Sequence, residues 1–208
     1  MRERRRVKYL LKERKKLNNH SFSLIANNCN GCVLLHELGM KFNSQFVNLF
    51  LNANDYIKYL ENFDYYNRLD LSFDSSVTVD YPIGKLGDLK INFVHYKTAE
   101  EAREKWEERK KRINRDNIFI MFTEQDDCSP ELIKRFNDLP FNNKVVFTYR
   151  EYKDIESAIY CKRFKSNPLG VHMFFEYTNN FSSKRKYDMF SFVSWFNGET
   201  NLKKLIKG

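Results

Sequence analysis

Short apolar segments alternate with helix signals along most of the chain, and this alternation limits the folds open to it. Segments that suit buried strands lie at residues 23–26, 46–51, 89–96, 117–123, 144–148, 157–164 and 171–177. Helices are predicted at residues 5–17, 32–39, 54–66, 98–114, 129–139 and 187–196. Strands separated by helices favour a largely parallel sheet covered on both faces. We therefore expect an α/β fold, a three-layer α/β/α arrangement around a largely parallel or mixed sheet.

The 208 residues suit one domain with additions at its ends. We expect a basic N-terminal helix (1–19), an α/β core domain (20–164) and a less regular, aromatic-rich C-terminal appendage (165–208) packed on the core. No run approaches the roughly 18 apolar residues of a membrane-spanning helix, and the first residues lack the apolar region of a signal peptide. With four cysteines and no export signal, the chain is expected in a reducing, cytoplasmic compartment.

The net charge of +9 is concentrated at the N-terminus. Residues 1–16 hold nine basic and two acidic side chains, a net +7, which leaves +2 for the rest. A nucleic-acid binder usually spreads its cations over the fold, so nucleic acid is disfavoured as a partner. Val7, Leu10, Leu11 and Leu17 fall near one stripe of the predicted helix 5–17. Such a helix could bind the inner membrane surface through residues 1–17; the alternative is a helix docked on its own domain.

Cys29 and Cys32 form a C-x-x-C sequence at the first strand–helix turn. One such pair does not supply the four ligands of a structural zinc site. It could be a thioredoxin-like dithiol, but two small residues buried at a turn are the favoured interpretation.

Polar side chains follow several of the predicted strands. These clusters are Asn27–Asn28, His95–Tyr96, Glu124 with Asp126 and Asp127, and Tyr149–Arg150. In open α/β sheets, ligands bind outside the carboxyl ends of the strands. If the strands are parallel neighbours, the four clusters converge on one edge of the sheet and form a site there.

His95 is the candidate general base, because it ends an apolar strand and histidine serves this role near neutral pH. The alternative is a half-buried histidine held by hydrogen bonds. For His20, His36 and His172 a structural role is favoured.

The turn from Asn27 to Gly31 leads directly into a predicted helix, where backbone N–H groups could hold a phosphate. The side chains of Asn28 and Asn30 suit sugar hydroxyls, and helix capping is the alternative. Arg109 or Arg112, on the helix that carries Trp106, could clamp a phosphate. A solvated charged face is the alternative for that helix.

Glu124 and Asp126 resemble the acidic strand tip that holds a divalent ion in nucleotide-sugar transferases. Oxygen ligands of this kind would take Mg²⁺ or Mn²⁺. The alternative is that these carboxylates are ordinary partners of the next helix dipole.

An ordered set of segments resembles one bacterial family. The matching residues are Asn27–Gly31, His36–Gly39, Lys41–Ser44, Phe46–Leu49, Asp55–Lys58, Asn62, Tyr81–Pro82, Gly84, Phe93–Tyr96, Glu101–Ala102, Trp106, Arg109, Arg112–Asn114 and Lys144–Phe147. They resemble a family of domains of unknown function whose members are often labelled exopolysaccharide biosynthesis protein. The resemblance covers roughly residues 20–150, and the family usually has glycine in place of Cys32.

The resemblance implies an α/β fold and a setting in capsular or exopolysaccharide gene clusters, but no settled reaction. With the strand-end clusters, it leads us to expect a sugar-acting transferase with a phosphate-bearing, nucleotide-sugar-like donor. His95 would be its base. The expected substrate-binding residues are Asn27, Asn28, Asn30, Gly31, Ser44, Tyr96, Trp106, Arg109 and Arg112. The alternative is a non-catalytic glycan-binding or scaffold subunit of a membrane-associated complex.

Overall fold

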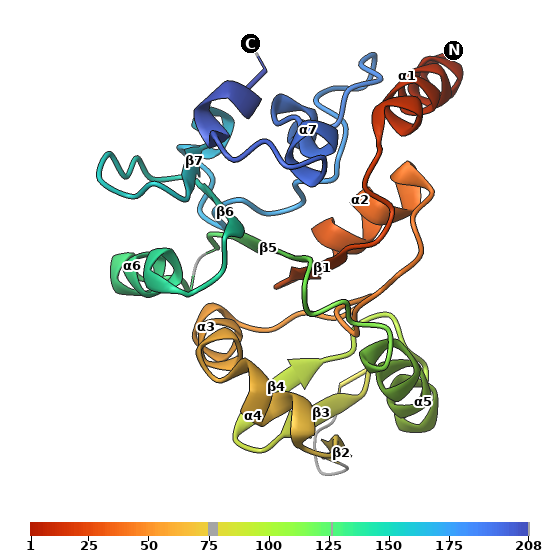
Figure 1. Ribbon diagram of the computed structural model, residues 1–208, viewed down its shortest axis with the longest axis vertical. Coiled ribbons are helices and arrows are strands. Elements are labelled where there is room, and N and C mark those ends of the chain that lie inside the picture. Colours follow the sequence, from red (N-terminus) through yellow and green to blue (C-terminus); the bar gives the residue numbers. More distant parts are fainter. Residues whose placement is uncertain (75–78, 126, 208) are drawn as a thin grey trace.

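The computed structural model describes residues 1–74, 79–125 and 127–207, and is built around a four-stranded parallel sheet (Figure 1). Its strands are β1 (Ser23–Ala26), β5 (Ile118–Thr123), β6 (Asn143–Thr148) and β7 (Ala158–Tyr160), in the order β1-β5-β6-β7. Every neighbouring pair is parallel. The expected α/β fold with a parallel sheet is therefore confirmed.

Local signals set the ends of the main helices. Helix α2 (Asn30–Leu38) ends at Gly39, which adopts the left-handed conformation (φ +70°) that favours glycine. Helix α5 (Ala99–Lys110) begins after Thr98, whose hydroxyl accepts the N–H of Glu101 at 3.1 Å. Helix α6 (Pro130–Asp138) has the predicted Ser129 cap followed by Pro130.

A second sheet is antiparallel and separate from the first. It contains β2 (Ser72–Phe73), β3 (Ile83–Leu86) and β4 (Leu89–Asn92), in that order. Gly87, at φ +62°, allows the two-residue turn that folds β4 back on β3. The strand predicted at 89–96 thus ends at Asn92 and joins another sheet.

Two predicted strands are wrong, and a positive φ interrupts each of them. Segment 46–51 is buried but irregular, with Asn48 at φ +60° and a single bridge from Phe50 to Asn92. Segment 171–177 also forms no strand, since Met173 lies at φ +48°. Left-handed backbone breaks the extended conformation that a strand requires.

Two predicted helices are divided, and the last predicted strand is short. Helix 54–66 is α3 (Ala53–Glu61) followed by α4 (Phe63–Arg68), and helix 187–196 is the 3₁₀ turn η2 (Lys186–Met189) followed by α7 (Phe192–Phe196). Strand β7 stops at Tyr160 and the 3₁₀ turn η1 (Lys162–Phe164) follows. A further 3₁₀ turn, η3 (Leu202–Leu205), lies near the C-terminus.

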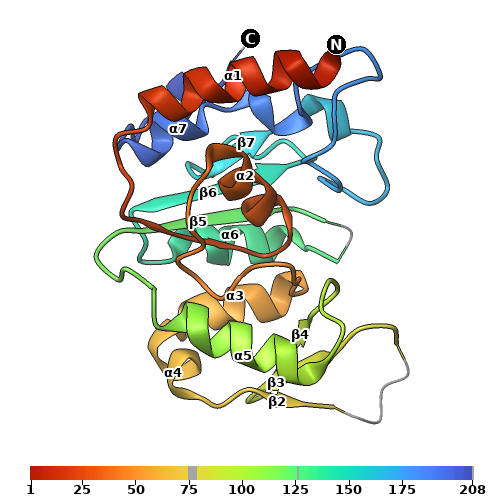
Figure 2. The ribbon, with the colours of Figure 1, turned by 90° about the vertical axis from the view of Figure 1, so that its right-hand side faces the viewer.

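Helices cover both faces of the parallel sheet (Figure 2), and each face packs on its own apolar core. Ile120 and Phe122 of β5 point into a core shared with α3, α6 and the second sheet. Phe119 and Met121, alternating with them, point into a core shared with α2 and α7. The parallel sheet therefore lies between these two cores, and the three-layer order stays a prediction.

Helix α1 (Arg2–Lys16) docks on α2 and α7 and lies at one extremity of the molecule (Figure 2). The predicted apolar stripe is divided between two faces. Leu10 and Leu17 face the molecule, whereas Val7 and Leu11 are 54% and 50% exposed. Among the helices described, none is both long enough and apolar enough to cross a bilayer.

Candidate functional site

Asn27 joins two strands at the carboxyl edge of the parallel sheet. Its buried side-chain oxygen accepts the backbone N–H (3.1 Å) and the hydroxyl (3.2 Å) of Thr123. Asn28 donates to the same hydroxyl at 2.6 Å and accepts the backbone N–H of Asn30 at 3.1 Å. The Asn30 side chain accepts the N–H of Phe175 at 3.1 Å. These amides have partners within the chain, and their contact with a sugar stays a prediction.

Gly31 and Ser44 hold neighbouring segments close to β1. A Cβ atom at Gly31 would come within 2.6 Å of the Ala26 Cβ, so glycine permits the close approach of α2 to the strand. The buried Ser44 hydroxyl donates to the Leu24 carbonyl at 2.6 Å. Both residues therefore have a clear packing role, whatever they contribute to ligand binding.

Glu124 follows β5 and is fully buried. Its carboxylate accepts the backbone N–H groups of Tyr149 (2.9 Å) and Arg150 (3.2 Å), the Arg150 Nε (2.6 Å) and the Tyr152 hydroxyl (2.6 Å). Burial and the hydrogen bond to Glu124 raise the pKa of Tyr152 above its ordinary value. The Asn27, Glu124 and Arg150 clusters therefore meet at this edge, with the carboxylate already surrounded by donors.

Asp126, the second predicted metal ligand, lies outside the described residues. Within the residues that are described, no three His, Cys, Asp or Glu side chains are grouped to hold a metal ion. The Mg²⁺ or Mn²⁺ site stays a prediction.

His95 does not join the edge of the parallel sheet. It lies exposed in the turn after β4, which belongs to the second sheet. The expectation that all four strand-end clusters converge is therefore wrong for this one, because β4 is not a parallel neighbour of β1, β5 and β6. His95 lines none of the five main cavities formed by the described residues.

Tyr96 and Arg109, two predicted ligand residues, are in direct contact. The buried Tyr96 hydroxyl donates to the Val47 carbonyl at 2.9 Å and accepts from Arg109 at 2.5 Å. Burial raises the pKa of Tyr96 against the opposing effect of Arg109, and the nearby Cys32 adds to the rise. Arg109 also lies over the Phe42 ring, with 5.7 Å to its centroid. This pair therefore contacts the segment that follows α2, at Phe42 and Val47.

Trp106 and Arg112 have partners of their own, although Arg112 also contacts Phe42. Trp106 is 1% exposed and packs in the core, 5.9 Å from Phe46 between ring centroids. The Arg112 guanidinium donates to the Phe42 carbonyl at 3.3 Å and pairs with Glu108 on its own helix. Both side chains are thus committed to local structure.

The two thiols of the C-x-x-C sequence lie at the start of α2. Cys29 is the residue that precedes the helix, and Cys32 lies in its first turn. A hydrogen bond with Cys29 lowers the pKa of the Cys32 thiol to about 7 against the effect of burial, with backbone hydrogen bonds helping. The same bond raises the pKa of Cys29. Cys32 also lies 3.5 Å from the Asn48 side-chain oxygen.

Cys32 faces an open groove of about 620 Å³ between α1, α2 and the segment 177–185. The polar residues of its wall that bear on chemistry are Arg14, Cys32, His36, Asn48, Tyr177 and Arg185. Sequence reasoning treated His36 as an ordinary helix residue. The signal that could have found it is the i,i+4 spacing of Cys32 and His36, which places both on one face of a helix.

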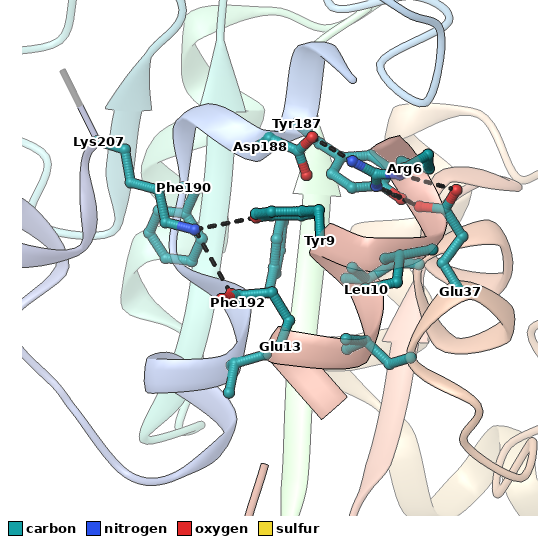
Figure 3. Close-up of a pocket in the computed structure, with 13 residues that line it drawn as sticks. Arg6, Tyr9, Leu10, Glu13, Glu37, Tyr187, Asp188, Phe190, Phe192 and Lys207 are labelled. Atoms are coloured by element: carbon teal, nitrogen blue, oxygen red, sulfur yellow. Dashed lines mark hydrogen bonds and ion pairs between the residues drawn. The ribbon is translucent and has the colours of Figure 1, made fainter. Parts of the chain in front are cut away.

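A buried ionic network separates this groove from a small cavity of about 20 Å³. Figure 3 shows the small cavity and the network residues that line it. Arg6, only 3% exposed, pairs with Glu37 of α2 and Asp188 of η2. Glu37 also accepts from the Tyr187 hydroxyl and from Arg185 Nε at 2.7 Å. Burial acts to lower the pKa of Arg6, but its bonds with the two carboxylates outweigh burial and raise it.

Comparison with known sequences gives one family and one relative. The pattern of the domain of unknown function DUF1919 matches residues 1–197, well beyond the 20–150 of the resemblance noted above. A protein of Haemophilus influenzae described as an uncharacterized protein is 44% identical over 184 residues, which cover 88% of this chain and 87% of that protein. Neither match bears on polysaccharide synthesis, which stays a prediction.

Proposed function

The chain belongs to the DUF1919 family, and we propose that it is a sugar-acting transferase that binds a phosphate-bearing donor, such as a nucleotide-sugar, in the groove between α1 and α2. The setting we propose, exopolysaccharide or capsular polysaccharide synthesis, comes from the resemblance stated above. The observation that carries the proposal is a ligand-sized groove whose wall brings together the Arg14 guanidinium, the His36 imidazole and the Cys32 thiol, and the pKa of that thiol is lowered.

The groove has the size of a small-molecule site. Its volume of about 620 Å³ falls within the roughly 300–1,000 Å³ typical of ligand pockets. Phe42 and Tyr177 offer aromatic faces, and the half-buried Asn48 amide offers a donor and an acceptor for sugar hydroxyls.

Arg14 supports the phosphate end of such a ligand. Its Nε donates to the Glu37 carbonyl at 2.9 Å, which fixes the guanidinium at the groove wall. Among the residues the structure describes, no carboxylate pairs with it. A guanidinium held in this way matches two oxygens of a phosphate.

His36 is the group we propose to take the proton of the acceptor hydroxyl. Sugar transfer needs a base within hydrogen-bond reach of that proton, and imidazole is the commonest base in proteins. His36 is exposed on the groove wall, with Cys32 one turn earlier on α2. His95, which the sequence favoured, lies in the turn after β4 of the second sheet, and it is the alternative base to be compared with His36.

A thermal-shift panel of nucleotide-sugars and sugar phosphates, with and without Mg²⁺ or Mn²⁺, tests binding. A ligand at a hundred times its Kd adds about 2.7 kcal/mol, which is roughly 5–10 °C for a domain of this size. Arg14→Gln should abolish the shift, whereas Arg4→Gln, on the outer face of α1, should keep it. No shift with any donor, or equal loss in both variants, would overturn the proposal.

Turnover then distinguishes the two histidines. With a donor that binds, release of nucleoside diphosphate is measured for His36→Ala and His95→Ala. We expect His36→Ala to lose about 10²- to 10⁴-fold in turnover while keeping its thermal shift. Loss in His95→Ala alone would restore the base that the sequence favoured.

The second candidate function is a non-catalytic glycan-binding or scaffold subunit at a membrane. The exposed basic face of α1 favours it. Donor binding without release of nucleoside diphosphate in the wild-type protein would decide for this candidate.

A further inference from the structure

The outer face of α1 carries a row of exposed basic side chains. Its exposed basic residues are Arg4, Arg5, Lys8, Lys12 and Lys15. Within the described part of the chain, none of these five side chains pairs with a carboxylate. They lie opposite Arg6 and Glu13, the buried residues that face the molecule. The structure therefore presents a strip of positive charge to the solvent.

Exposed apolar side chains accompany this strip. Val7 and Leu11, one turn apart, are 54% and 50% exposed and border the cations. Phe181, in the loop 177–185, is 90% exposed. Arg2 donates to the Asn180 carbonyl at 3.4 Å, so this loop lies beside the N-terminal end of α1 (Figures 1 and 2).

The face is also held rigidly. Buried Arg6 ties α1 to α2 and η2 through two carboxylates, and Lys207 contacts Tyr9 (3.2 Å) on the other flank. A preorganised surface loses little conformational freedom when it binds. The helix therefore does not have to fold at its target.

We propose that this surface docks on an anionic phospholipid bilayer. The α1 outer surface, as we call it, consists of Arg4, Arg5, Val7, Lys8, Leu11, Lys12 and Lys15, extended by Phe181. Charge complementarity selects the occupant: unpaired cations interleaved with exposed apolar groups match lipid phosphates above acyl chains. The helix lies parallel to the membrane plane, with Val7, Leu11 and Phe181 at the headgroup boundary.

This inference goes beyond the proposed function and does not depend on a donor. It also sets the groove beside the membrane, because Val7 belongs both to the α1 outer surface and to the groove wall. An acceptor carried on a lipid would then reach the groove from the bilayer.

Co-sedimentation with vesicles tests the docking surface. The probes are vesicles of phosphatidylcholine alone and of phosphatidylcholine with an equal amount of phosphatidylglycerol. We expect binding to the anionic vesicles only. The triple change Lys8→Ser, Lys12→Ser and Lys15→Ser should weaken it about 100-fold, at about fivefold for each charge, and Phe181→Ser should weaken it about tenfold.

Matched controls lie at the opposite end of the molecule. Lys90→Ser, Lys97→Ser and Lys111→Ser remove the same charge from exposed positions around β4 and α5, and Tyr65→Ser removes a ring that is 57% exposed. These variants should bind as the wild type does. Equal loss in test and control triples, or equal binding to both kinds of vesicle, would overturn the proposal.

Phe181→Trp gives a readout that does not depend on the charge variants folding. Trp106 and Trp195 are 1% and 2% exposed, so lipids with brominated chains should quench only the introduced indole. Absence of that quenching with anionic vesicles contradicts insertion. Preferential binding of duplex DNA over vesicles at equal phosphate concentration would identify a different partner and also overturn the proposal.

Discussion

Two buried carboxylates, Glu37 and Glu124, each bind an arginine, yet they join different parts of the molecule. The donors to Glu124 among the described residues lie in 149–152, and two of them are backbone N–H groups. Among the described residues, the Glu37 carboxylate accepts only from side chains, those of Arg6, Arg185 and Tyr187. Glu124 therefore stiffens one edge of a sheet, whereas Glu37 holds together segments from both ends of the chain and forms a wall of the groove.

The largest expected effect comes from Arg6→Met. It tests whether breaking the Glu37 cluster costs more unfolding free energy than breaking the Glu124 cluster. The change leaves Glu37 and Asp188 buried without their shared cation. Removing one partner of a buried pair costs about 3–5 kcal/mol of unfolding free energy. Urea unfolding at pH 7 measures it, with Arg4→Met as an exposed control that should stay within about 0.5 kcal/mol. A loss below 1 kcal/mol would contradict the buried pairing.

Glu124→Gln should cost less, about 1–3 kcal/mol. The amide keeps an oxygen that can accept the backbone N–H groups of Tyr149 and Arg150, so only part of the cluster is lost. Glu151→Gln, at the exposed neighbouring position, is the control. The comparison fails if Glu124→Gln proves more destabilising than Arg6→Met under the same conditions.

The pH dependence of stability sharpens the comparison on the Glu37 side. Burial acts to raise the pKa of Glu37, but bonds with Arg6, Tyr187 and Arg185 outweigh burial and lower it below the ordinary 4.5. A carboxyl with a lowered pKa in the folded state contributes stability above its unfolded pKa and loses it as pH falls through the folded value. The difference in unfolding free energy between wild type and Glu37→Gln should therefore shrink below about pH 4.5. A difference that is constant from pH 7 to pH 3 would rule out this linkage.

The smallest expected effect concerns the reactivity of the Cys32 thiol, which faces the groove. Its lowered pKa predicts that alkylation by iodoacetamide, followed by peptide mass spectrometry, reaches its midpoint at a lower pH than that of an ordinary thiol. Cys29→Ala removes the hydrogen bond that lowers this pKa, so the midpoint should move upward. Cys161, which is fully buried and whose pKa burial raises, serves as the unreactive control. An unchanged midpoint in Cys29→Ala would assign the effect to the backbone hydrogen bonds instead.

Local chemistry made much of the fold predictable. Gly39, Thr98 and Ser129 mark helix ends because their backbone or hydroxyl groups act within a few residues. The strands of the parallel sheet were found because they are short, apolar and bounded by turns. Segment 46–51 misled the prediction, since its buried apolar residues look like those of a strand, and nothing nearby signals the positive φ of Asn48.

The candidate site was less predictable, for a physical reason. Asn27, Glu124 and Arg150 could be placed together because parallel strands end at one edge. The Glu37 partners lie 31, 148 and 150 residues away along the chain, and no local pattern encodes such distances. His95 was misplaced because strand order, which assigns β4 to another sheet, is not readable from a single sequence.

The ionic attachment of α1 also sets how the molecule should respond to temperature. Apolar contacts weaken on cooling, because their driving force is largely entropic near room temperature. One such contact is the stacking of Phe22 on Phe196, the last residue of α7. The desolvation penalty of charged groups falls as temperature rises. Both contributions therefore weaken on cooling, so the ionic attachment of α1 and the aromatic packing of α7 should loosen together at low temperature.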